Sequence, residues 1–241
     1  MSSEEWDNEA AENISRRISY GGIERCRIMP SFIHFFGADG TGKTTQGQML
    51  VGRMRKNGID AKLVRIRSGR TFASILYSFF RKVAPSLVVL GGDKRVLRIR
   101  SIRGRFGRTT WSLIEFGSML PWLIRGVFVP IGRGKTVVAE RYIIDAIATI
   151  AFMIDDPSWE KSYLARVMLD FIPRNSAFIH LDASYGTIAS RKGLTVDPRG
   201  YLEFQRGTYL RFAKATGAIT IDTAKHSLLE THKLIYGFVN L

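Results

Sequence analysis

The chain of 241 residues lacks the features that mark a protein built for an oxidising compartment. It has one cysteine, Cys26, which excludes a disulfide bond within the chain. No apolar stretch follows Met1, and five of the first twelve residues are acidic instead, so no signal peptide is recognisable. From these absences we expect a cytoplasmic protein.

Long apolar runs are also missing from the sequence. The most apolar segment, Trp111–Pro130, is interrupted by Glu115, Arg125 and two prolines. A membrane-spanning helix requires about 18 apolar residues in succession. We therefore expect this segment to pack against a sheet rather than to span a membrane, while peripheral binding to a membrane surface stays open.

Linkers and repeats are absent as well. No stretch rich in Pro, Gly and Ser divides the chain, and 45% of its residues are hydrophobic, enough for one sizeable core. We expect residues 31–241 to form a single domain, preceded by an N-terminal extension over residues 1–30.

Acidic residues are scarce in one region, although the whole chain carries a net charge of +15. Between Arg53 and Lys135 there are 19 of the 36 Lys and Arg residues, against only three carboxylates. The densest basic segment is 94–108. It could bind nucleic acid, a membrane surface or an acceptor phosphate, or be a solvated face. No recognisable nucleic-acid-binding module accompanies it.

The most informative segment that is present is Gly37–Thr44, which fits the pattern G-x-x-x-x-G-K-[ST]. The apolar residues 31–36 before it predict a buried strand, and a helical pattern follows it to about Asn57. A loop in this position points backbone N–H groups at an anion. Lys43 then meets the outer phosphates of a nucleotide, and Thr44 offers a hydroxyl to Mg²⁺.

Further strands alternate with helical segments along the chain. We predict them over residues 61–66, 136–139, 177–182 and 218–222. This alternation predicts an α/β fold with a five-stranded parallel sheet that has helices on both faces. Ligands of such sheets bind at the carboxyl ends of the strands.

Two other segments contribute candidate chemistry. Glu140 and Arg141 follow the strand 136–139, where a carboxylate can hold Mg²⁺ through water and an arginine can bind a phosphate. The segment 191–200 has basic residues between glycines, which suits a short lid over a transferring phosphoryl group. Arg206 and Arg211 follow on a predicted helix, Tyr201–Lys214, and their spacing of five does not place both on one face.

Together these segments resemble thymidylate kinases. The loop Gly37–Gln46 and the triplet Glu140–Tyr142 are similar to the family's phosphate loop and Asp-Arg-Tyr motif. Phe178–Asp182 and Gly217–Thr223 resemble two further family segments, the second near the adenine of ATP. The resemblance covers about residues 31–67 and 132–241, and residues 68–131 are unmatched.

The resemblance implies a P-loop nucleoside monophosphate kinase that uses ATP and Mg²⁺ and makes dTDP from dTMP. The implied ATP-binding residues are Gly37, Gly40, Thr41, Gly42, Lys43, Thr44, Thr45, Arg191 and Thr223, and the metal ligands are Thr44 and Glu140. The implied acceptor-binding residues are Asp39, Arg67, Arg70, Arg141 and Tyr142. The implied catalytic residues are Lys43, Glu140, Arg141 and Arg199. Gly40 and Thr41 bring no arginine into the loop, as in the bacterial-type enzymes, which take the catalytic arginine from the lid, so Arg199, with Arg191 as the second candidate, matches that role.

Some departures from the family keep alternatives open. Glu140 stands where the family has Asp, and the segment Arg65–Arg70 lacks the family's Pro-containing acceptor motif. Glu140-Arg141 also resembles the Glu-Arg-Ser motif of deoxynucleoside kinases, so a nucleoside or another small hydroxyl compound is an alternative acceptor. A P-loop ATPase that binds nucleic acid or membrane through segment 94–108 is the alternative from another class. The sequence leaves the oligomeric state open, a homodimer included.

Overall fold

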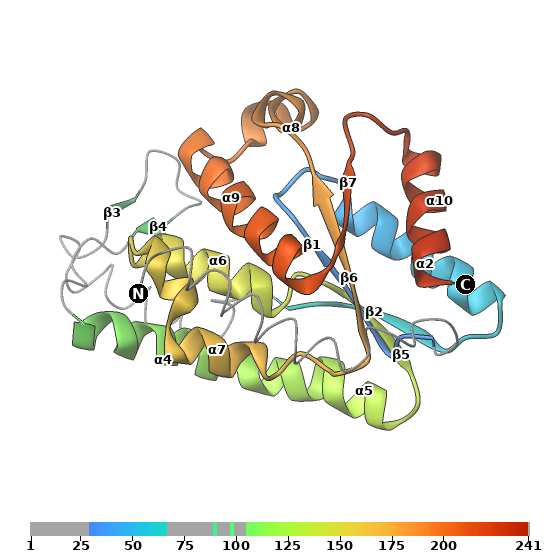
Figure 1. Cartoon of the computed structure of the whole chain (residues 1–241), viewed down its shortest axis with the longest axis horizontal. Coiled ribbons are helices and arrows are strands. Elements are labelled where there is room, and N and C mark those ends of the chain that lie inside the picture. Colours follow the sequence, from blue (N-terminus) through green and yellow to red (C-terminus); the bar gives the residue numbers. More distant parts are fainter. Residues whose placement is uncertain (1–28, 67–88, 91–96, 99–104, 241) are drawn as a thin grey trace.

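The computed structural model describes residues 29–66, 89–90, 97–98 and 105–240. Its main sheet has five parallel strands in the order β2-β5-β1-β6-β7 (Figure 1). The strands are β1 (Phe32–Phe36), β2 (Ala61–Arg65), β5 (Thr136–Glu140), β6 (Ser176–Asp182) and β7 (Ile219–Asp222). The predicted α/β class and parallel sheet are confirmed.

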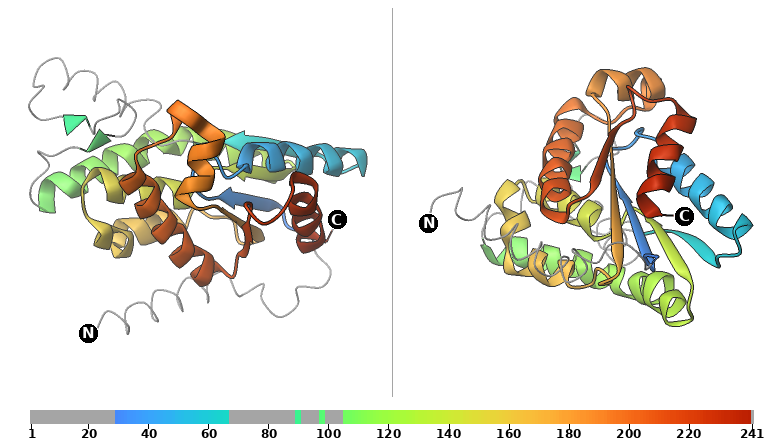
Figure 2. Two further views of the ribbon diagram at one scale, coloured as in Figure 1. Left: turned by 90° about the horizontal axis from the view of Figure 1, so that it is seen from above. Right: turned by 45° about the vertical axis from the view of Figure 1, so that its right-hand side comes forward.

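Helices cover both faces of this sheet (Figures 1 and 2). One face is covered by α2 (Lys43–Lys56) and α10 (Leu228–Val239), and the other by α6 (Ile143–Met153) and α9 (Arg199–Thr216). The side chains of β1 alternate accordingly: Phe32 and Phe36 enter the core beneath α6, and Ile33 and Phe35 enter the core beneath α2.

The strand order creates a crevice above β1 and β5. These strands are neighbours, but the helix after β1 is α2 and the helix after β5 is α6, on opposite faces of the sheet. The two connections therefore diverge at the carboxyl ends of the strands, where ligands of open α/β sheets bind.

The apolar segment before β5 is part of one continuous helical rod, Phe106–Gly132. Three elements follow each other without a break: α4 (Arg105–Leu123), the π-helical turn η2 (Ile124–Phe128) and α5 (Val129–Gly132). Neither Pro121 nor Pro130 ends the rod, and the residues Leu123, Phe128 and Val129 around the π-helical turn keep right-handed helical backbone angles.

The length of this rod bears on the expectation that the segment packs against a sheet rather than spanning a membrane. By length and composition alone, Phe106–Gly132, with 27 residues, is the one helix in the described part of the chain that could cross a membrane. Core helices of soluble proteins can have the same length and composition, and 33% of the most apolar 18-residue stretch of Phe106–Gly132 is buried. As predicted, part of the segment packs against the core, since Trp111 and Phe116 belong to the cluster beneath α6.

The remaining elements complete the chain. They are the antiparallel pair β3 (Val89–Leu90) and β4 (Leu97–Arg98), η3 (Pro157–Lys161), α7 (Tyr163–Leu169), α8 (Tyr185–Lys192) and η4 (Gly193–Thr195). The pair β3–β4 was not predicted. The predicted lid, residues 191–200, consists of the end of α8, the turn η4 and the first residues of α9, which begins at Arg199 rather than at Tyr201.

Candidate active site

The loop between β1 and α2 has backbone angles that depend on glycine. Gly37, Gly40 and Gly42 have φ angles of 139°, 100° and 90°. A Cβ atom on Gly37 would lie 2.2 Å from the carbonyl oxygen of Leu181, whereas one on Gly42 would meet nothing within 4 Å. The first glycine thus permits close packing on β6, and the last leaves open space at the N-terminus of α2, the position where such loops hold an anion.

Lys43, the first residue of α2, folds back over this loop. Its Nζ donates to the carbonyl oxygens of Gly37 at 2.6 Å and Ala38 at 2.7 Å. Burial lowers the pKa of Lys43 to about 8, against smaller opposing effects from Asp145 and Glu140. Its Nζ also lies 3.7 Å from Oδ1 of Asp39, and a bound polyphosphate would add further negative charge beside this buried cation.

Thr44 lies against the end of strand β5. Its hydroxyl donates to Glu140 Oε1 at 2.6 Å, and Arg65 Nη2 lies 3.0 Å from the same carboxylate oxygen. Glu140 is only 2% exposed, while Thr44 and Thr45 are exposed toward the open side of the loop. Thr41 is buried, and its hydroxyl donates to the Ala38 carbonyl, so its side chain holds the loop rather than facing solvent.

These groups fit a nucleotide-bound Mg²⁺ ion. Mg²⁺ prefers oxygen ligands and commonly takes only one or two of them from the protein, with water and phosphate oxygens completing its shell. The hydroxyl of Thr44 and the carboxylate of Glu140 are such ligands and already lie side by side. Among the described residues no group of three or more His, Cys, Asp and Glu side chains forms a separate metal site.

Arg141 is turned toward the loop by an unusual backbone conformation. Its φ is 63°, in the left-handed region that side chains other than glycine rarely adopt. Its guanidinium Nη2 forms an ion pair with Asp39 inside the loop, and its Nε is buried without a hydrogen-bond partner. A strained residue with an unsatisfied donor beside a phosphate loop is typical of a functional position.

Asp145 anchors this strained turn, and sequence reasoning missed it. It lies at the third position of α6, where its Oδ2 accepts the backbone N–H of Tyr142 at 3.2 Å and lies 3.3 Å from Nε2 of His34. Tyr209 donates its hydroxyl to the other oxygen at 3.1 Å. Burial raises the pKa of Asp145, but the hydrogen bond with His34 and nearby cations hold it below its ordinary value. The signal that could have found Asp145 is its place three residues after the helix cap.

Tyr142 does not take the place predicted for it. Its side chain is fully buried, its ring lies 4.9 Å from that of Phe32, and its hydroxyl donates to the carbonyl of Phe171 at 2.7 Å. The assignment of Tyr142 to acceptor binding is therefore corrected: an aromatic ring that follows a strand end can turn into the core as readily as toward a ligand.

On the other side of the loop, Arg191 joins it to the segment after β7. Its guanidinium donates to the hydroxyl of Thr223 at 2.9 Å and to the Thr223 carbonyl at 2.6 Å, and lies 3.4 Å from the carbonyl of Gly40. The structure thus brings together Arg191, Thr223 and the phosphate loop, three predicted parts of the ATP site.

Arg199, the predicted catalytic lid residue, does not contact the loop in this structure. Its side chain is 70% exposed, and its Nε donates to Glu203 at 2.7 Å on the next turn of α9. Lys192, the residue after Arg191 at the end of α8, was missed as a separate candidate. It contacts Asp197 at 3.1 Å, and its side chain lies within 3.1 Å of where a Cβ of Gly40 would be.

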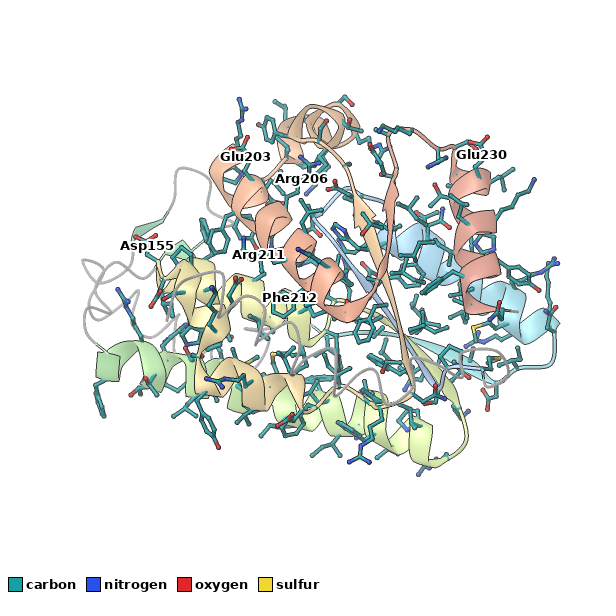
Figure 3. The ribbon with its side chains drawn as sticks, viewed as in Figure 1. Asp155, Glu203, Arg206, Arg211, Phe212 and Glu230 are labelled. Carbon is teal, nitrogen blue, oxygen red and sulfur yellow. The ribbon has the colours of Figure 1, made fainter. Side chains whose placement is uncertain are left out.

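Two further arginines extend from α9 in different directions (Figure 3). Arg206 forms a two-pronged pair with Asp182 at the carboxyl end of β6, with contacts of 2.7–3.1 Å. Arg211 pairs instead with Glu160 on η3 at 2.7 Å. The two side chains have different partners, as their spacing predicted.

Arg67, Arg70 and residues 94–96 and 99–104 of the basic segment lie outside the described residues, so their predicted roles stay predictions. Arg108, at the end of the basic segment, forms an ion pair with Asp156 at 2.8 Å.

Comparison with known proteins adds to this geometry. No protein-family model matches the chain, and no curated protein matches it. Among solved structures, the chain is similar to the thymidylate kinase from Ehrlichia chaffeensis, with a TM-score of 0.55 and 18% sequence identity over 87% of this chain and 98% of that one. At this identity the likeness concerns the fold alone, a five-stranded parallel sheet with helices on both faces.

Proposed function

We propose that this protein is an ATP-dependent nucleoside monophosphate kinase that uses Mg²⁺ and phosphorylates dTMP to dTDP. One observation carries the proposal: the end of β5 sets Glu140 against Thr44 and Arg141 against Asp39, on the two sides of one phosphate loop. The likeness in fold to a thymidylate kinase supports the same activity.

On the donor side, the loop and Lys43 hold the phosphates of ATP. Lys43 exchanges its two carbonyl partners for phosphate oxygens, which compensate its buried charge better than neutral carbonyls do. Thr44 and Glu140 hold Mg²⁺, which neutralises charge on the phosphate oxygens when bound. Arg191 and Thr223 lie beside the loop, where they complete the ATP site.

On the acceptor side, Arg141 is the residue that binds the acceptor phosphate. Its present partner, Asp39, holds it in place in the absence of that phosphate. When Arg141 turns to the incoming dianion, Asp39 is released to accept a hydrogen bond from a sugar hydroxyl. The strained turn at Arg141, held by Asp145, keeps the guanidinium at the loop throughout.

The arrangement favours a phosphate acceptor over a hydroxyl acceptor. A hydroxyl needs a base to take its proton, whereas a phosphate is already an anion near neutral pH. The carboxylate of Glu140 accepts from Thr44 and Arg65, and Asp39 is paired with Arg141. Both carboxylates beside the loop are engaged by donors, which supports positioning and charge neutralisation as their role. A cytoplasmic location, with its supply of ATP and Mg²⁺, goes with this proposal.

The experiment is a panel of nucleoside monophosphates incubated with ATP, Mg²⁺ and the full chain. We expect ADP and the nucleoside diphosphate to form in equal amounts, with dTMP the best acceptor. Lys43→Ala should abolish transfer, while Lys56→Ala, an exposed position on the same helix, should leave it unchanged. Formation of ADP without any phosphorylated acceptor would identify an ATPase and overturn the proposal.

A further inference from the structure

The rod Phe106–Gly132 turns an apolar face outward. Six large apolar side chains along it are between 38% and 86% exposed: Phe106, Leu113, Trp122, Ile124, Phe128 and Val129. The rod lies along the outer edge of the molecule, below α7, in Figure 1 and in the right panel of Figure 2. At 1.5 Å per residue its 27 residues extend for about 40 Å. An exposed apolar surface of this length is characteristic of an interaction site.

The opposite side of the rod is fixed to the domain. Trp111, Phe116, Met119, Leu123 and Val127 are buried in the same core cluster as the side chains of α6. Removing the rod from the domain to span a bilayer would expose this core. A partner must therefore bind the rod where it lies, along its outward face.

The charges on this face are of one sign. Glu115 is the only acidic residue from Arg105 to Gly132, and it is buried. Arg125 is exposed in the middle of the apolar face, and Arg133 is exposed just beyond its end. If two copies of the chain paired through this face, each copy would present arginines and no exposed carboxylate from the rod to pair with them. Aromatic and aliphatic side chains interspersed with cations match the interface of an anionic bilayer instead.

We propose that the outward face of this rod docks on an anionic lipid bilayer, with the helix axis in the plane of the surface. Phe106, Trp122 and Phe128 enter the boundary between headgroups and acyl chains, while Arg125 and Arg133 contact lipid phosphates. The protein is then a peripheral membrane protein. This inference does not depend on the proposed kinase activity.

The test is flotation of the full chain with vesicles of phosphatidylcholine alone or mixed with phosphatidylglycerol. We expect binding to the mixed vesicles and at least tenfold less to the neutral ones. The double variant Trp122→Ser/Phe128→Ser should lower the partition coefficient by about tenfold or more. Its matched control is Leu228→Ser/Leu229→Ser on α10, which removes two side chains that are 50% and 64% exposed on another part of the surface.

A second pair of variants distinguishes the contribution of the rod's outward face to vesicle binding from that of the net charge of +15. Arg125→Glu and Lys56→Glu change the total charge equally, but only the first lies on the rod, so only the first should weaken binding, by about tenfold. Absence of binding to anionic vesicles, or equal losses in the matched controls, would overturn the proposal. So would a dimer in sedimentation experiments that Trp122→Ser/Phe128→Ser dissociates, because the face would then belong to a second copy.

Discussion

Lys43→Met is the substitution that separates the functional role of the loop lysine from its effect on stability. Burial lowers the pKa of Lys43 from 10.5 to about 8, so the folded protein at pH 7 contains a cation in an unfavourable place. At 1.36 kcal/mol per pKa unit, this corresponds to about 3 kcal/mol. Methionine of similar length loses the bonds that the charged ammonium donates to the Gly37 and Ala38 carbonyls, at a cost of about 1.5 kcal/mol each. We expect the variant and the wild type to be about equally stable at pH 7.

The difference in unfolding free energy between the wild type and Lys43→Met should change with pH in a definite direction. Between about pH 8 and 10.5 the unfolded state holds the lysine proton and the folded state does not, so raising the pH stabilises the wild type relative to the variant. From pH 7 to 9.5 the wild type should gain about 2 kcal/mol relative to Lys43→Met. Urea unfolding at both pH values measures this, with Lys56→Met as the exposed control. ATP and Mg²⁺ should raise the melting temperature of the wild type only.

The reasoning would be refuted if the difference in unfolding free energy between wild type and Lys43→Met stayed constant over this pH range. In that case burying the charge of Lys43 would cost no free energy relative to water. The two carbonyl oxygens would then stabilise the ammonium fully, and a bound phosphate would not be needed to compensate its charge.

Three further predictions concern the neighbours of the loop. Arg141→Ala should raise the KM for the acceptor by about 30-fold or more, since a charge-assisted contact to phosphate is lost, while the KM for ATP changes little in steady-state assays. Arg191→Ala should lower kcat by about 10³-fold and Arg199→Ala by less, because only Arg191 contacts the loop; the opposite order would return the catalytic role to Arg199. Tyr142→Phe should lower the unfolding free energy by about 1 kcal/mol, because the Phe171 carbonyl loses its partner, and a raised acceptor KM would contradict its place in the core.

Patterns of neighbouring residues were enough to predict the sheet and the phosphate loop. Apolar strands that alternate with helical segments, and a loop with three glycines at fixed spacing, predict a parallel sheet with the loop at its carboxyl edge, whereas the order of β1, β5 and β6 comes from the structure. The contact between Thr44 and Glu140, 96 residues apart, fits the adjacent strands β1 and β5, because Thr44 lies in the first turn of α2, the helix that follows β1, and Glu140 is the last residue of β5.

Other features depend on contacts that sequence spacing does not contain. The inward turn of Tyr142 is set by Phe32 and Phe171, and the anchoring of the Arg141 turn by Asp145 depends on His34 and Tyr209 from other elements. The helix also continues through Pro121 and Pro130, with a π-helical turn between them, although proline predicts a helix end.

The measurement that tests the central claim most directly is the ratio of kcat/KM for dTMP to that for thymidine, with ATP and saturating Mg²⁺. If Arg141 binds an acceptor phosphate beside the ATP site, dTMP should be preferred by orders of magnitude, and Arg141→Ala should remove most of that preference. Phosphorylation of thymidine with no reaction of dTMP would contradict the account, because the acceptor would then be a hydroxyl and the carboxylate of Glu140 its candidate base.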